Sequence, residues 1–135
     1  MWKALIVDDE EEMRELLFCI YESAGYEVRE AANGAEALEA AADFRPDIIV
    51  TDIVMPVMDG WEFIERLRRD EEFARAPVIV ISGKCASKED FKDKRPDNCE
   101  FLSKPFDLER LMKISQRMLP TSNYSRSGAR PANAV

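Results

Sequence analysis

Short apolar segments recur along the chain, and amphipathic segments separate them. The apolar segments are residues 3–7, 26–30, 47–51, 77–81 and 99–103, of which the second is the weakest. Several of them are β-branched and almost continuously apolar, which is typical of strands buried on both faces of a sheet. Five such segments alternating with helical patterns predict an α/β fold, an open parallel sheet with helices on both sides.

The segments between the predicted strands have the apolar stripes and end signals of helices. The stripe of the first helix consists of Met13, Leu16, Leu17 and Ile20. Its acidic first turn, residues 10–12, is favoured by the helix dipole, and Gly25 is a natural stop. Asn33, Asp59 and Asp107 are predicted to cap the later helices, with Glu62 in the capping-box position after Asp59. The last helix has a stripe of Leu108, Leu111, Met112, Met118 and Leu119.

Two segments lack the apolar residues that a packed element needs. Residues 84–98 hold Phe91 as their one large apolar residue and are interrupted by Pro96, so we expect a short, mobile or distorted helix. Residues 120–135 have the composition of a disordered tail or a truncated linker. We therefore expect one domain over residues 1–119.

Charge and cysteine content narrow the classes of function. The net charge of −8 argues against direct binding to nucleic acid, which needs a basic face. The three cysteines have no CxxC spacing, so they predict neither a disulfide framework nor a zinc site, and they favour the cytoplasm. No apolar run approaches the length of a membrane span, and the sequence contains no histidine to act as a general base.

Polar residues collect where the predicted strands end. They are Asp8 and Asp9 after the first strand, Asp52 after the third, Ser82 after the fourth and Lys104 after the fifth. Taken singly, each is an ordinary cap, turn or surface residue. In an open α/β sheet, however, ligands bind beyond the carboxyl ends of the strands. The combination therefore predicts that three carboxylates, a hydroxyl and an ammonium group converge at one edge.

Three carboxylates in one place need a positive partner. Two like charges about 4 Å apart repel by roughly 4 kcal/mol at an effective dielectric constant near 20. Oxygen ligands without cysteine or histidine suit a hard cation, with Mg²⁺ preferred over Ca²⁺ or Mn²⁺. Lys104 and Ser82 opposite the metal would complete a clamp for a phosphoryl group. The pattern thus indicates a metal-assisted phosphoryl site with a carboxylate as the acceptor.

Four motifs resemble those of response-regulator receiver domains. They are LIVDDE (5–10), DIIVTDIVMPVMDG (47–60), PVIVISG (77–83) and FLSKPF (101–106). The resemblance runs from about Lys3 to Leu119 with the motif spacing intact. It implies a flavodoxin-like, doubly wound (βα)5 fold with strand order 2-1-3-4-5.

The resemblance also implies a role for each site residue. Asp52 would be the phosphoacceptor, attacking a phosphohistidine on a sensor histidine kinase or a phosphotransfer protein. Asp9 and Asp52 would bind Mg²⁺, or Mn²⁺ as a substitute, with Asp8 helping through water and the backbone carbonyl of Val54 as a further ligand. Lys104 would contact the phosphoryl oxygens, and its bond to Pro105 would be cis.

A conformational switch is the second implication of the resemblance. Ser82 would hydrogen-bond the phosphoryl group, and Phe101, at the position of the switch aromatic, would rotate inward. Added negative charge of about 1.5–2 units favours such a shift of a loop that offers a donor. The downstream protein target would bind the face formed by the fourth helix, fifth strand and fifth helix. In this chain the fourth helix is unusually charged, which points to a more ionic contact.

A stand-alone receiver is one of several functions that such a sequence pattern can indicate. A receiver portion of a longer regulator, with a DNA-binding or enzymatic output module, stays open. A phosphatase of the haloacid-dehalogenase type needs an Asp-x-Asp motif where this chain has adjacent Asp8 and Asp9. A flavin carrier would need a phosphate loop of Ser, Thr and Gly after the first strand, where this chain is acidic. We expect a signalling domain and not a conventional enzyme.

Overall fold

The computed structural model describes residues 1–83 and 98–119, and within them five parallel strands form one sheet. The strands are β1 (Lys3–Val7), β2 (Glu27–Ala31), β3 (Ile48–Thr51), β4 (Val78–Ser82) and β5 (Cys99–Ser103). Their order is β2-β1-β3-β4-β5, which confirms the predicted topology. β1 and β5 have the predicted bounds, and the other three begin one residue later than predicted.

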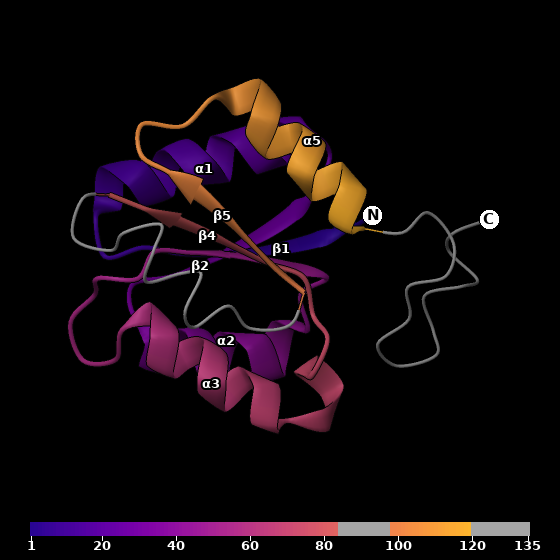
Figure 1. The fold of residues 1–135 in the computed structure, drawn as a ribbon. Coiled ribbons are helices and arrows are strands. Elements are labelled where there is room, and N and C mark those ends of the chain that lie inside the picture. Colours follow the sequence, from indigo (N-terminus) through magenta and orange to yellow (C-terminus); the bar gives the residue numbers. More distant parts are fainter. Residues whose placement is uncertain (84–97, 120–135) are drawn as a thin grey trace.

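Helices cover both faces of the sheet (Figure 1). They are α1 (Glu11–Ser23), α2 (Gly34–Phe44), α3 (Gly60–Arg69) and α5 (Leu108–Met118), with a short 3-10 turn η1 (Glu71–Phe73). α1 and α5 lie on one face, and α2 and α3 lie on the other (Figure 1). Each face has its own apolar cluster, one around Leu17, Ile79 and Leu111 and the other around Ile49 and Phe63. The doubly wound prediction is confirmed.

The predicted helix ends are confirmed by side-chain contacts. The side chains of Asn33, Asp59 and Asp107 accept hydrogen bonds from backbone amides in the first turns of α2, α3 and α5. Gly25 follows the end of α1 with a φ of +95°, a conformation that glycine adopts without a steric penalty.

Two residues of the predicted apolar stripes are on the surface. Leu16 is 49% exposed because the buried stripe of α1 is centred on Leu17 and Tyr21, and adjacent helical residues point about 100° apart. Leu108 is 51% exposed. Helical side chains lean toward the N-terminus, so Leu108, as the first residue of α5, leans past the end of the helix.

Two sequence predictions concern residues that lie mostly or entirely outside the described part of the chain. The prediction of a short or distorted helix over 84–98 concerns residues that, apart from Asn98, lie outside the described ones. The predicted tail, 120–135, also lies outside them. Among the helices in the described ranges, none is long and apolar enough to cross a membrane.

The loop between β3 and α3 contains a strained residue. Val57 has a φ of 69°, in the left-handed region that β-branched residues rarely adopt, and its side chain is 81% exposed. This conformation costs a non-glycine residue about 1–2 kcal/mol, and asparagine tolerates it better. Val57 therefore stores strain and offsets little of it by burial.

Val57→Asn should stabilise the fold. We expect the free energy of unfolding to rise by roughly 0.5–1 kcal/mol, since the strain falls and little apolar burial is lost. Urea titration measures the change. Val54→Asn is the control, because Val54 is also exposed in this loop and has no positive φ. An unchanged or lower midpoint for Val57→Asn would contradict the expectation.

Candidate functional site

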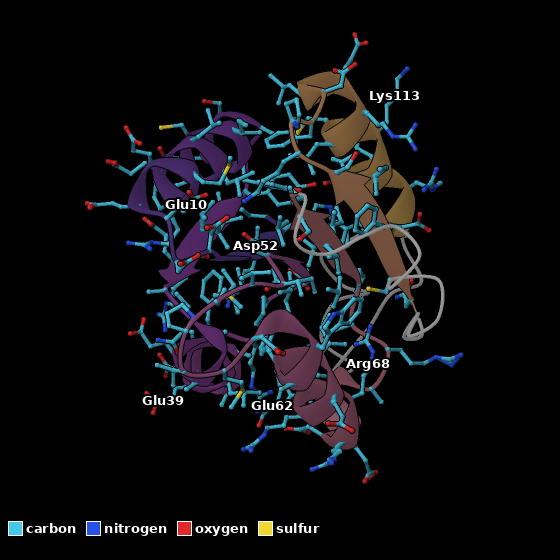
Figure 2. All side chains as sticks on the ribbon, turned by 60° about the vertical axis from the view of Figure 1, so that its left-hand side comes forward. Glu10, Glu39, Asp52, Glu62, Arg68 and Lys113 are labelled. Atoms are coloured by element: carbon cyan, nitrogen blue, oxygen red, sulfur yellow. The ribbon has the colours of Figure 1, made fainter. Side chains whose placement is uncertain are left out.

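The parallel register of the sheet places two acidic residues side by side. Val7 is the register partner of Thr51, so Asp8 and Asp52 are the next residues on neighbouring strands. The Asp52 amide donates to the Val7 carbonyl over 3.0 Å. Glu10 and Asp52 lie near each other at this end of the sheet (Figure 2). The predicted convergence of Asp8 and Asp52 follows from strand pairing alone.

Three carboxylates surround one small space. Asp8, Asp9 and Asp52 each offer an oxygen that lies within 4.8 Å of the other two. Asp8 is buried, Asp52 is 8% exposed and Asp9 is exposed, so the space opens to solvent on one side. An all-oxygen donor set with an open side fits a hard divalent cation such as Mg²⁺, which keeps several waters.

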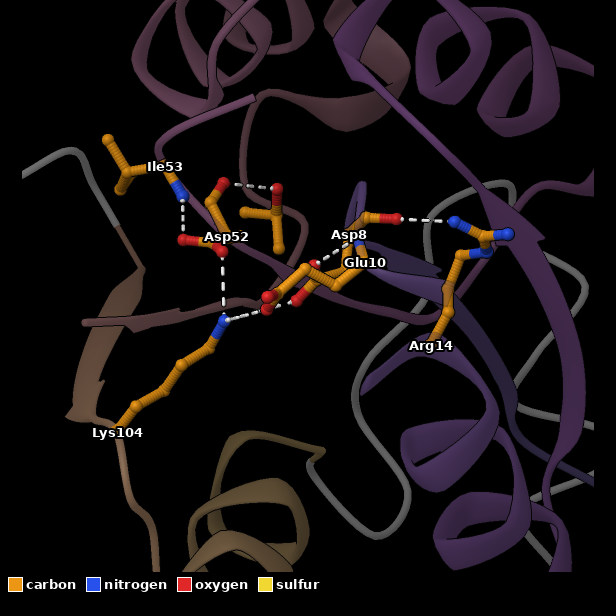
Figure 3. Close-up of polar contacts among 7 residues, drawn as sticks. Asp8, Glu10, Arg14, Asp52, Ile53 and Lys104 are labelled. Carbon is orange, nitrogen blue, oxygen red and sulfur yellow. Dashed lines mark hydrogen bonds and ion pairs between the residues drawn. The ribbon is translucent and has the colours of Figure 1, made fainter. Parts of the chain in front are cut away.

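The ammonium group of Lys104 brings a positive charge into this pocket (Figure 3). Its Nζ lies 2.9 Å from Asp52 Oδ2, 3.4 Å from Asp8 Oδ2 and 3.6 Å from Glu10 Oε1. The Lys104–Pro105 bond is cis, as the sequence comparison implied. The ammonium group therefore contacts the carboxylates of both neighbouring strand ends.

Burial and charge shift the pKa values in the pocket. Burial raises the pKa of Asp8, although the hydrogen bond from the Glu10 amide and the nearby Lys104 partly offset this rise. Burial lowers the pKa of Lys104, but its hydrogen bond and charge interaction with Asp52, and the charge of Asp8, outweigh burial. The net pKa of Lys104 is raised, so the side chain carries its positive charge at neutral pH.

Asp52 is held at both carboxylate oxygens. Oδ1 accepts a hydrogen bond from the Ile53 amide over 2.6 Å, and Oδ2 accepts one from Lys104 (Figure 3). Behind it, Gly60 packs on the Asp52 carbonyl, and a Cβ added to Gly60 would lie 2.8 Å from Ile53 Cα. The carboxylate is thus fixed in orientation, in a position to act as a nucleophile beside a positive charge.

The remaining predicted residues lie around the same sheet edge. Ser82 is buried at the end of β4, and its carbonyl accepts from the Lys104 amide over 2.9 Å. Phe101 is half-buried in β5 and packs against the apolar cluster of the α2 and α3 face. Val54 follows Asp52 by two residues, and its side chain is exposed.

Two further residues contact the pocket, and the sequence pattern predicts neither contact. Glu10 belongs to the acidic first turn predicted for the first helix, yet its carboxylate reaches Lys104. Arg14 had no sequence signal, but its Nη1 donates to the Asp8 carbonyl over 2.8 Å. Its contact depends on a side chain that folds back along the helix, which periodicity does not reveal.

Comparison with known proteins gives one consistent family. A family model described as the response regulator receiver domain matches residues 4–116. The chain is 33% identical to protein PilH of Pseudomonas aeruginosa, over 88% of this chain and 98% of that protein. The structure is similar to chemotaxis response regulator CheY4 of Vibrio cholerae, with a TM-score of 0.77, 37% identity, and coverage of 88% and 99%.

Other relatives are longer than this chain. It is 33% identical to the probable transcriptional regulator ycf29 of Porphyra purpurea, over 82% of this chain. The match spans 53% of that relative, and the match to regulator RpaA of a Synechocystis strain spans 49%. The chain thus corresponds to about half the length of these curated relatives.

Proposed function

We propose, from the premise that this chain belongs to the response-regulator receiver domain family, that Asp52 is its phosphoacceptor. Receiver domains act in two-component signalling and carry the phosphoryl group on an aspartate. The assignment to Asp52 rests on one observation. Of the three clustered carboxylates, Asp52 makes the shortest contact with the Lys104 ammonium, 2.9 Å, and it is less deeply buried than Asp8, with 8% of its surface exposed against 1%.

The other two carboxylates are less suited to accept the group. Asp8 is 1% exposed, so an incoming phosphorus atom has little access to it. Asp9 is exposed, and within residues 1–83 and 98–119 no ion pair joins it to Lys104. We assign both to metal binding, with Asp52 and the Val54 carbonyl. Bound Mg²⁺, or Mn²⁺ in its place, would supply positive charge to the phosphoryl oxygens.

The chain's own residues then carry out phosphoryl transfer from a sensor histidine kinase or a phosphotransfer protein. An Asp52 oxygen forms the new bond to phosphorus while the bond to the donor nitrogen breaks and its electron pair stays on the imidazole. Lys104 balances charge on the phosphoryl oxygens, and the Ile53 amide holds the second Asp52 oxygen. Positioning and electrostatics supply the catalysis, as is general for phosphoryl transfer.

Phosphorylation would then change one surface of the domain. Ser82 would donate its hydroxyl proton to a phosphoryl oxygen, and Phe101 would move inward behind it. Two facts support these roles, the burial of Ser82 at the pocket edge and the half-buried position of Phe101 on the adjoining strand. The downstream target would bind the face that includes β5 and α5.

The exposed side of α5 suggests the charge of that target. Arg110, Lys113 and Arg117 are spaced by three and four residues, which places them on one side of the helix, around a hollow of about 280 Å³. Asp107 and Glu109 line the same hollow, and Arg117 pairs with Glu100 over 3.4 Å, so the positive charge there is centred on Arg110 and Lys113. Lys113 points outward from α5 (Figure 2). Basic side chains on a protein of net charge −8 favour an acidic partner surface.

We further propose a receiver domain over residues 1–119 that works in the cytoplasm as a signalling module and not as a conventional enzyme. No direct contact with nucleic acid or membrane is part of this proposal. The alternative is a receiver within a longer regulator. It is supported by longer relatives such as ycf29, in which the region that matches this chain makes up 53% of the length.

Phosphorylation by a small donor tests the proposed function. Incubation with acetyl phosphate and Mg²⁺ should add one phosphoryl group per chain, detected by intact-protein mass spectrometry. EDTA should prevent the addition, because the carboxylate cluster would lose its counter-charge. A chain that gains no mass, or gains it equally with EDTA, would argue against a metal-assisted phosphoacceptor.

A further inference from the structure

Arg14 makes two contacts that tie the acidic loop to the edge of the sheet. Its Nη1 donates to the carbonyl of Asp8 over 2.8 Å, and its Nε donates to Glu30 Oε1 over 3.2 Å. The guanidinium therefore spans from the end of β1 to β2. Its side chain is 19% exposed, whereas the next residue of the helix, Glu15, is exposed.

The Asp8 carbonyl lies where strand pairing stops. The Asp8 amide still donates to the Ala31 carbonyl over 3.1 Å, and β1 itself ends at Val7. Beyond that point the chain leaves the sheet to enter α1. The side chain of Arg14 thus donates a hydrogen bond to the carbonyl of Asp8, the first residue after the end of β1.

Fixing this carbonyl also fixes Asp9. The Asp8 carbonyl and the Asp9 amide belong to one planar peptide unit, so they rotate together. Asp9 is exposed, and repulsion from the other two carboxylates favours conformations in which its side chain turns outward to solvent. The orientation of this peptide plane therefore helps to decide whether the Asp9 carboxylate faces the pocket.

We propose that Arg14 is a positioning residue that holds the Asp8–Asp9 peptide so that both carboxylates face the metal site. The inference rests on the proposed function, because it concerns that same pocket. Arg14 and Lys104 approach Asp8 from opposite sides, Arg14 at the backbone and Lys104 at the carboxylate (Figure 3). Glu30 anchors the guanidinium and balances its charge.

The direction in which the metal dissociation constant changes when Arg14 is replaced distinguishes a positioning role from a simple effect of its charge. Removing a positive charge near a cation site should strengthen cation binding if charge alone matters. Loss of a group that orients metal ligands should weaken it, by roughly tenfold for partners of this kind. The two explanations of Arg14 predict opposite changes in the dissociation constant for a divalent ion.

Mn²⁺ is a suitable probe, because its free concentration is read from its electron paramagnetic resonance signal. We expect Arg14→Met to raise the Mn²⁺ dissociation constant about tenfold. Arg14→Lys keeps the charge but lacks the planar fork that reaches both partners, so it should also weaken binding. Arg69→Met is the matched control, since Arg69 is an exposed arginine of α3 paired with Glu65 and loses the same charge.

Further variants and assays separate this inference from the proposed function. Glu30→Gln leaves Arg14 in place without its ionic anchor, and should weaken Mn²⁺ binding about twofold or more even if Arg14→Met fails to fold. Unchanged or tighter binding in the folded Arg14→Met, or unchanged binding in Glu30→Gln, overturns the inference alone. A wild-type chain that binds no Mn²⁺ overturns both. A chain that binds Mn²⁺ but takes no phosphoryl group overturns only the proposed function.

Discussion

Asp52→Asn should reduce labelling by acetyl phosphate on the order of 100-fold or more, equivalent to a barrier increase of about 2.7 kcal/mol or greater. The amide oxygen is a poor nucleophile and brings no negative charge to the metal or to Lys104. The change is nearly isosteric, and the amide oxygen can still accept from the Ile53 amide. The loss would therefore be chemical and not structural.

Asp59→Asn is the control for this result. Asp59 lies in the same loop and caps α3 through its side chain, and asparagine is an equally good cap. The two variants lose the same charge, so a general effect of charge would appear in both. Labelling that persists in Asp52→Asn, or that disappears in Asp59→Asn, would reject Asp52 as the acceptor.

Saturating Mg²⁺ should raise the free energy of unfolding, by about 2.7 kcal/mol at 100 times the dissociation constant. The reason is that the folded chain brings three carboxylates together, and the unfolded chain does not. Asp9→Asn should remove most of this increase. Because the change also relieves repulsion among the clustered carboxylates, we expect the metal-free stability of this variant to equal or exceed that of the wild type.

Urea titrations with Mg²⁺ and with EDTA give the two stabilities. Glu12→Gln is the matched control, because Glu12 is an exposed acid in the first turn of α1 and loses the same charge. It should keep the full increase. If Asp9→Asn and wild type gain equally from Mg²⁺, the ion binds elsewhere.

The centre of the site could be predicted because it depends on strand ends. Asp8 and Asp52 each follow a strongly apolar strand, Lys104 follows the more polar β5, and the parallel sheet then brings such positions to one edge. The fold followed from the same signal. β2 gave the weakest signal because it is an edge strand whose residues are mostly exposed.

Features that depend on side-chain direction could not be predicted. A helical stripe gives the buried side only to within about one residue, which is why Leu16 was assigned to the core in place of Tyr21. The contact from Arg14 to a backbone carbonyl leaves no periodic trace, and neither does the left-handed backbone of Val57. The roles proposed for Ser82 and Phe101 depend on a second, phosphorylated conformation, and neither residue type by its spacing predicts such a change.

The contacts behind the Asp52 backbone limit the direction in which the site can adjust to an added group. Its amide is bound to β1, and Gly60 leaves no space behind its carbonyl. The loop that follows is fastened to α2 by the Gly34 amide, which donates to the Met58 carbonyl over 3.1 Å. A bulky anion added to Asp52 would therefore find no space on this side, and the groups toward β4 and β5, among them Lys104, would have to move instead.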